Sequence, residues 1–218
     1  RFYYFGSVYG GGYGSLDNTL DDNDSVTAAT TDYATGKRAQ ADATPAVLAG
    51  RVYGNTFVNV TGGTLLGEVF GGGEMASVGY EQTGSRGNTN VNIGEAGPTG
   101  TGATFSGTGM VFGANNVAGT PYGNTSVHIY RTAHGADAAH NLYPTGITNN
   151  EELATNALSQ TYALQAVYGG GNLAAHTPYA ANGTTNVYVL YCEENTIKQV
   201  YGGGNAAATQ NNHVIVEG

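Results

Sequence analysis

Five copies of one short phrase constrain the fold of this chain more than any other feature. Each copy is a valine and an aromatic residue followed by small residues, mostly glycine. The copies begin at Val8, Val69, Val111, Val167 and Val200. A phrase that recurs along a chain is typical of a stacked repeat protein, in which each unit packs on its neighbours. Such proteins usually act as scaffolds and surfaces, and any activity is carried by what is inserted into them.

A second phrase alternates β-branched and polar residues with a period of two. It occupies residues 55–60, 88–93, 124–129, 184–189 and 211–216. This alternation describes a strand with one buried face. We expect two inward columns of aliphatic side chains, namely Val58, Val91, Val127 and Val187, and Val60, Ile93, Ile129 and Val189. Thr56, Thr89, Thr125 and Thr185 share the parity of the valines, so they are predicted to lie inside, which argues against a threonine-ranked ice-binding surface.

Together the phrases predict an all-β protein, a right-handed parallel β-solenoid with loop inserts and one short lateral α-helix. The glycine phrases are unequally spaced, which favours an irregular β-helix over a strict short-period one. We expect a single domain over residues 1–218, with inserts at 13–50 and 130–166. In the second insert, Thr148 and Glu151 form a capping-box pattern, and a less polar stripe from Leu153 to Leu164 predicts the helix.

The composition bears on partners and on location. The formal net charge of −9 argues against nucleic acid and anionic membrane surfaces as partners. Charged residues make up only 11% of the chain, and this neutral-polar balance favours an extracellular location. No stretch approaches the roughly 20 apolar residues of a membrane span. Cys192 is the only cysteine, so we expect no internal disulfide.

The two ends of the chain carry no predicted cap. Residues 1–5 are rich in aromatic side chains, and residue 218 follows directly after a strand phrase. Solenoids need polar caps over their terminal strands. We therefore expect either a segment of a longer protein or a filament subunit whose open edges pair with other copies or further repeats. Because Arg1 begins no signal peptide, we expect a mature or excised piece.

The repeat phrases also carry a family resemblance. Val-Tyr-Gly-Gly-Gly-Asn-x-Ala at 167–174 and 200–207, with Gly-Asn-Thr-x-Val-x-Ile at 87–93 and 123–129, resembles the glycine-rich repeats of large bacterial surface and adhesin-like proteins. The resemblance covers the repeat phrases and not the two inserts. It implies secretion, a place at the cell surface, and a role in adhesion or in a surface filament, with host or glycan surfaces as partners.

The first insert holds a cluster of oxygen ligands. Asp17, Asp21, Asp22 and Asp24 lie close together with Asn23. Such hard ligands suit Ca²⁺, but the spacing lacks the glycine and the closing glutamate of the helix-loop-helix calcium pattern. A solvated acidic loop is the favoured interpretation, and calcium is the alternative. No other cofactor is expected.

The aromatic residues of the glycine phrases occupy one equivalent position. We expect them to form a ladder, made of Tyr9, Phe70, Phe112, Tyr168 and Tyr201. Residues of the same parity beside them are mixed in polarity, which indicates a position that faces away from the core. Stacking of the rings on one another is favoured over stacking on sugar rings.

The sequence offers no clear catalytic group. Glu68, Glu74, Glu81 and Glu95 share no equivalent repeat position, and Arg51 and Arg86 lie in different units. His134 and His140, with Asp137 between them, fit no helical metal pair, and Cys192 has no neighbouring cysteine. We expect a non-enzymatic, extracellular structural or adhesive protein. The alternative is a carbohydrate-binding or carbohydrate-cleaving β-helix, tailspike-like or lyase-like.

Overall fold

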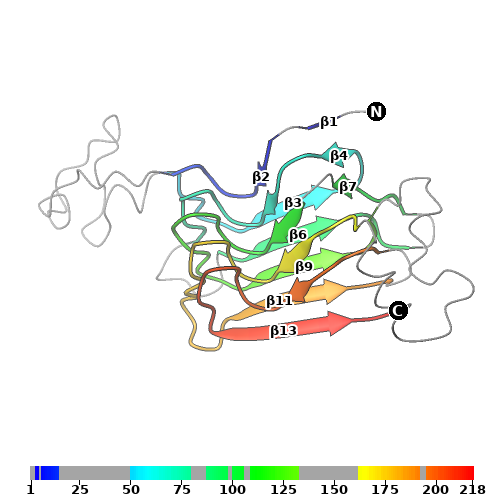
Figure 1. Cartoon of the computed structure of the whole chain (residues 1–218). Helices are drawn as coiled ribbons and strands as arrows, with labels where there is room; N and C mark the ends of the chain where they lie inside the picture. The colour runs from blue at the N-terminus through cyan, green and yellow to red at the C-terminus, as the bar shows by residue number, and fades with distance from the viewer. Residues whose placement is uncertain are drawn as a thin grey trace, which may run out of the picture.

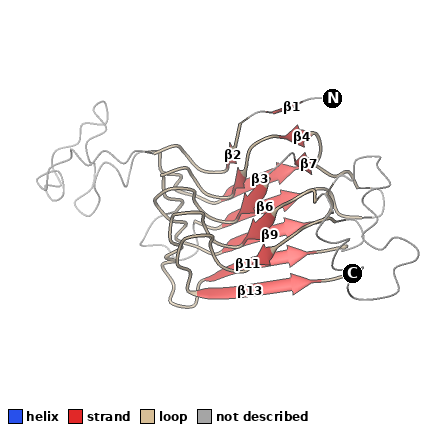
Figure 2. Cartoon of the chain, viewed as in Figure 1, coloured by secondary structure: helices blue, strands red, loops and turns tan. Residues whose placement is uncertain are grey.

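The structure is a computed structural model, and it describes residues 3–4, 6–14, 50–79, 87–97, 100–105, 109–132, 162–191 and 195–218. Within these residues all the regular secondary structure is β-strand, and all of the strand pairs are parallel. Figure 2 shows the strands and the loops that join them. The predicted all-β class with parallel pairing is therefore confirmed. The predicted helix falls largely on residues 148–161, which lie outside the described residues.

The strands form three sheets. The short sheet contains β1 (Tyr3–Tyr4), β4 (Thr64–Leu65) and β7 (Thr104–Phe105). The glycine sheet contains β2 (Val8–Tyr9), β5 (Val69–Phe70), β8 (Met110–Phe112), β10 (Ala166–Tyr168) and β12 (Val200–Tyr201). The long sheet contains β3 (Thr56–Val60), β6 (Thr89–Ile93), β9 (Thr125–Ile129), β11 (Thr184–Val189) and β13 (Asn211–Val216).

The chain visits the sheets in turn, and each passage adds one strand beside the previous one. From β2 it runs to β3 and β4, and it then returns to the glycine sheet at β5, directly beside β2. We call each such passage a layer. In Figure 1 the layers follow one another from β3 down to β13. This topology is compatible with a parallel β-solenoid.

The long sheet is in register along its whole width. Val91 lies between Val58 and Val127, and the same column continues through Val187 to Val214. Burial alternates along β3, β6, β9 and β11 because successive side chains point to opposite faces. The inward members are all buried: Val58, Val60, Val91, Ile93, Val127, Ile129, Val187 and Val189.

The core lies between the three sheets. The inward columns of the long sheet pack against valines of the glycine sheet, such as Val111, and against Leu65 and Phe105 of the short sheet. Where the short sheet has no further strand, single bridges take its place: Thr132 pairs with Ala103, and Leu164 pairs with Ile197. The buried apolar side chains therefore form one continuous core through all layers.

The layers extend into the second predicted insert beyond its predicted boundaries of 130 and 166. Thr132, Leu164 and Ala166 all take part in parallel pairing, although the valine-rich phrase that marks other strands is absent there. The first insert leaves and rejoins the stack at one point. Gly14 and Gly50 lie side by side with positive φ values of 78° and 67°, which L-residues with side chains rarely adopt.

Candidate functional site

The threonines of the second phrase bond the glycine phrases of neighbouring layers. Thr56 Oγ1 donates to Gly71 O at 2.6 Å, and Thr89 and Thr125 donate in the same way to Gly113 O and Gly169 O at 2.5 Å. Each threonine is buried. The hydroxyl groups therefore satisfy carbonyl groups that would otherwise be buried without a partner, and they are not presented to a ligand.

The asparagines that precede these threonines have a similar role. Asn55 Oδ1 accepts from the backbone N–H groups of Gly87 and Asn88, both at 3.0 Å. Asn88 Oδ1 accepts from Asn124 N at 2.8 Å, and Asn124 Oδ1 accepts from Thr184 N at 2.9 Å. Each amide oxygen thus caps the start of the next strand, so the Gly-Asn-Thr motif is a layer-joining device.

The five aromatic residues of the glycine phrases stack in one ladder. Successive ring centroids are 4.9, 4.7, 4.9 and 5.0 Å apart from Tyr9 to Tyr201, and the planes are within 10° of parallel. Phe70 and Phe112 are fully buried, on a cluster separate from the main core. Neighbouring rings cover the faces of Phe70 and Phe112, so these two rings offer no surface to a sugar.

An asparagine column runs beside the ladder, four residues after Phe112, Tyr168 and Tyr201. Asn205 Nδ2 donates to Asn172 Oδ1 at 2.9 Å, and Asn172 Nδ2 donates to Asn116 Oδ1 at 2.8 Å. Asn116 Nδ2 ends the column on Glu74 Oε2 at 2.8 Å. Sequence reasoning did not predict this column, although asparagine recurs four residues after the aromatic residue at positions 116, 172 and 205.

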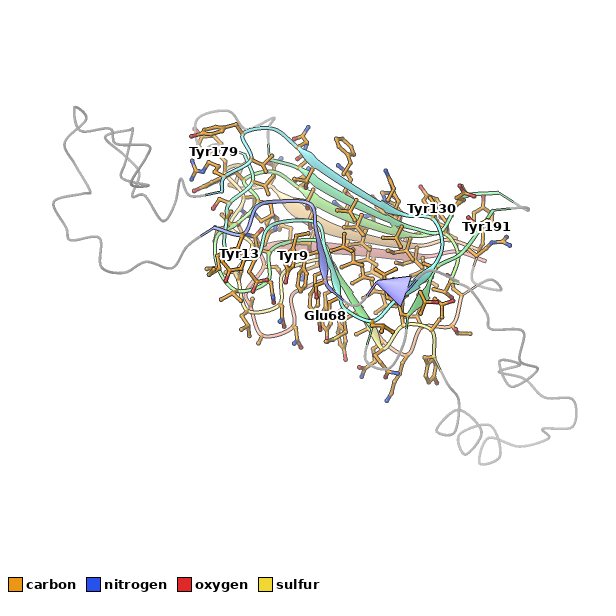
Figure 3. All side chains as sticks on the ribbon, turned by 90° about the horizontal axis from the view of Figure 1, so that it is seen from above. Tyr9, Tyr13, Glu68, Tyr130, Tyr179 and Tyr191 are labelled. Atoms are coloured by element: carbon orange, nitrogen blue, oxygen red, sulfur yellow. The ribbon has the colours of Figure 1, made fainter. Side chains whose placement is uncertain are left out.

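Glu74 lies close enough to Glu68 to influence the ionisation of its carboxyl group. Burial, and then the charge of Glu74, raise the pKa of the Glu68 carboxyl. Burial and the hydrogen bond with Glu74 raise the pKa of the Tyr9 phenol to about 12. Figure 3 shows Tyr9 and Glu68 on the same side of the stack, with Tyr13 nearby. Glu68 and Glu74 do not share an equivalent repeat position, but the structure brings Glu74 near Glu68.

The remaining candidate residues do not join this pair. Glu95 is exposed and accepts hydrogen bonds from Thr101 N and Oγ1. Among the described residues no three His, Cys, Asp or Glu side chains form a group that could hold a metal ion. Arg51 lies over the Tyr122 ring, with its guanidinium carbon 5.5 Å from the ring centroid. The other candidates lie outside the described residues: Asp17, Asp21, Asp22, Asp24, Glu81, Arg86, His134, Asp137, His140 and Cys192.

A polar cavity of about 170 Å³ lies at the N-terminal ends of strands β6, β9 and β11 of the long sheet. It is lined by residues of three layers, among them Asn88, Tyr122, Asn124, Pro178, Asn182 and Gly183. Asn88 and Asn124 begin adjacent strands, and the turn at 180–183, closed by Gly183 N bonding Ala180 O at 2.9 Å, forms the opposite wall. No carboxylate, amine or imidazole lines the cavity.

The loop that forms this wall is held by buried polar contacts. His176 Nε2 lies 2.8 Å from Gly123 O, and its side chain is 1% exposed. Burial lowers the pKa of the His176 imidazole, and the bond to Gly123 opposes that shift. Because a carbonyl accepts from Nε2–H, the ring is held as the neutral tautomer with Nδ1 unprotonated, and Nδ1 has no hydrogen-bond partner.

A second aromatic group lies near the C-terminal ends of strands β9 and β11 of the long sheet. His128 stacks on Tyr188 at 4.7 Å and on Tyr130 at 5.9 Å. Burial lowers the pKa of the His128 imidazole. The faces of these rings stack on one another, so the group belongs to the packing of the outward column of the long sheet.

No protein-family model, curated protein or solved structure matches this chain. Among the described residues no helix is long and apolar enough to cross a membrane. The fold and the site together define an all-β protein of parallel stacked layers, in which the repeat phrases serve the contacts between layers.

Proposed function

We propose that the chain is a right-handed parallel β-solenoid that serves as a non-enzymatic structural or adhesive element of a bacterial cell surface or surface filament. One observation carries the proposal: the threonine hydroxyl groups and the asparagine amide oxygens of the second phrase bond the backbone of the neighbouring layer. Right-handedness follows from the strong preference of parallel crossover connections, about 98% of which are right-handed. The low share of charged residues supports an extracellular setting.

The stack has the properties of a rigid spacer. The first three layers each contribute a threonine bond, an asparagine cap and a stacked ring to the next one, as Thr125, Asn124 and Phe112 illustrate. Stability in such proteins is a sum over neighbouring units, so layers can be added without redesign of the others. Stability that adds up layer by layer suits a protein that spans a distance and presents loops.

The edge of β13 is the surface through which we propose that the stack continues. Val214 and Val216 occupy the inward columns, yet they are 42% and 60% exposed, and Tyr201 at the end of the ladder is 41% exposed. A further layer with the same two phrases would cover all three side chains in register. We propose that another copy, or a further repeat, supplies this layer by parallel strand addition.

Paired cysteines test this assembly. Phe57 and His213 occupy the same outward column at opposite ends of the long sheet. Strands are about 4.8 Å apart, so the two Cα atoms are roughly 19 Å apart within one copy, but about 4.8 Å apart between copies stacked in register. Only the second distance permits a disulfide.

We expect Phe57→Cys with His213→Cys, in a Cys192→Ser background, to give a ladder of covalent multimers after oxidation. Asn59→Cys with His213→Cys is the matched control, because a shift of two residues places the Cα atoms roughly 8 Å apart. Equal cross-linking of both pairs, or of neither, would contradict stacking in register.

A carbohydrate-cleaving function is the second candidate, and the Glu68–Glu74 pair is the observation in its favour. Polysaccharide cleavage uses two carboxyl groups, one of them with a raised pKa. Glu68 has a raised pKa, but Tyr9 and Asn116 occupy the surroundings of Glu74. Chain shortening of a polysaccharide by the purified protein, abolished by Glu68→Gln, would replace the scaffold proposal with this one.

A further inference from the structure

We propose that the cavity at the start of the long sheet binds one residue of a neutral saccharide. This proposal goes beyond the scaffold role and stands independently of it, because a stack can assemble without a ligand. The cavity of about 170 Å³ matches a single small polar ring, or the few waters that such a ring would displace. It is too small for the larger ligands of typical binding pockets.

Oriented amide donors carry the first part of the argument. Asn88 and Asn124 each have the amide oxygen fixed on the backbone N–H of the next layer, at 2.8 and 2.9 Å. The oxygen is thus committed to the strand, and the NH₂ group on the same carbon is turned away from it. These NH₂ groups have no partner among the described residues, and Asn182 adds a third amide to the same lining.

The amide-rich lining carries the second part. Sugar hydroxyl groups are neutral donors and acceptors, and amides match them without a desolvation penalty for an ion. The lining contains no carboxylate, amine or imidazole. The Arg51 guanidinium lies next to it, 5.5 Å from the centroid of the Tyr122 ring, so it is the match of amides to hydroxyl groups that favours a neutral sugar.

Apolar surfaces carry the third part. Tyr122 and Pro178 line the cavity, and a sugar ring presents apolar C–H groups that pack on such surfaces. Tyr179 follows Pro178 and is 53% exposed. Unlike the rings of the ladder, Tyr179 stacks on no other ring among the described residues, so its face is available to a second sugar unit. Figure 3 places Tyr179 apart from Tyr130 and Tyr191, at the opposite end of the long strands.

The lining is also rigid, which lowers the cost of binding. A Cβ on Gly123 would lie 2.7 Å from Asn88 N, and a side-chain carbon on Gly183 would lie 2.5 Å from Pro178 Cγ. Only glycine fits at these two positions. Tyr179 N bonds Tyr122 O at 2.8 Å, and this bond fixes the rim against the layer beside it.

Titration with methyl glycosides of glucose, galactose, mannose and N-acetylglucosamine tests the proposal, with glucuronate as the charged comparison. Amide signals of Asn124, Tyr179 and Thr184 are followed by two-dimensional NMR up to about 10 mM probe, which detects affinities near 1 mM. We expect at least one neutral glycoside to shift these signals. No shift with any neutral probe, whether or not glucuronate shifts them, overturns the proposal.

Three variants localise the effect. Tyr179→Ala should weaken binding about 3- to 10-fold, whereas Tyr179→Phe should retain it. Asn182→Asp keeps the shape, removes the amide donors and adds a charge, so it should weaken binding by a similar factor. Tyr13→Ala removes a tyrosine that is 73% exposed outside the cavity lining and is the matched control. Equal binding by the Tyr179→Ala, Asn182→Asp and control proteins would exclude this cavity as the site.

Discussion

Thr125→Val removes one hydroxyl group from the middle of the stack and keeps the shape of the side chain. Thr125 is fully buried, and its Oγ1 donates to Gly169 O at 2.5 Å. Valine has the same branching and the same preference for strands, so packing on the neighbouring Gly113 is retained. The substitution therefore isolates the hydrogen bond between two layers.

The loss should be larger than that of an average hydrogen bond. A net hydrogen bond contributes about 1 kcal/mol, but a buried acceptor left without a donor costs about 1–3 kcal/mol. Gly169 is buried, so the loss of the threonine hydroxyl would leave its carbonyl oxygen without that donor. The extra methyl group of valine offsets part of this cost by burial of apolar surface. We expect the free energy of unfolding to fall by about 1–2 kcal/mol.

Urea denaturation followed by circular dichroism measures this difference. Ser126→Ala, at the next and outward-facing position of β9, is the control and should change the free energy by less than about 0.5 kcal/mol. Thr125→Ser should recover part of the loss because it keeps the hydroxyl. An unchanged denaturant slope ensures that the midpoint reports stability. If Thr125→Val is as stable as Ser126→Ala, the threonine bonds do not hold the layers together.

Three further predictions concern packing and pH. Phe112→Ala should cost about 3–5 kcal/mol of unfolding free energy, and Tyr201→Ala at the exposed end of the ladder clearly less, as denaturation would show. Burial lowers the pKa of His176, so its contribution to stability should fall as the pH drops below the unfolded value of about 6.5; His176→Gln should flatten the stability profile there, and an unchanged profile would contradict this. Burial and Glu74 raise the pKa of Glu68, so its contribution should be lost as the pH rises through the folded value; Glu68→Gln should raise the melting temperature at pH 7 and not at pH 4.

Much of the fold could be predicted from local pattern. The period of two in the second phrase assigns Val58 and Val91 to one face, because successive side chains of a strand point to opposite sides. Equal phrases in parallel strands favour pairing in register, because a shift of one residue would turn every valine to the outer face. The predicted neighbours Val127 and Val187 are accordingly paired in the structure.

The second insert was harder to delimit. Thr132 and Leu164 join the stack through single bridges, without the alternation that marks a strand in the sequence. A lone bridge depends on the layer beneath it, here Ala103 and Ile197, and leaves no periodic signal of its own.

What the sequence determined by itself is the repeating contact set: strands, corners, inward valines and the order of the aromatic rings. These features follow from backbone geometry and from one periodicity, both of which act over a few residues. What only the tertiary structure decided is which distant side chains meet. Glu74 bonds Tyr9 of the layer before it, and Asn88, Tyr122 and Asn182 of three layers line one cavity. Because loop lengths differ from layer to layer, such meetings depend on how each loop folds back on the stack, and no spacing in the chain encodes them.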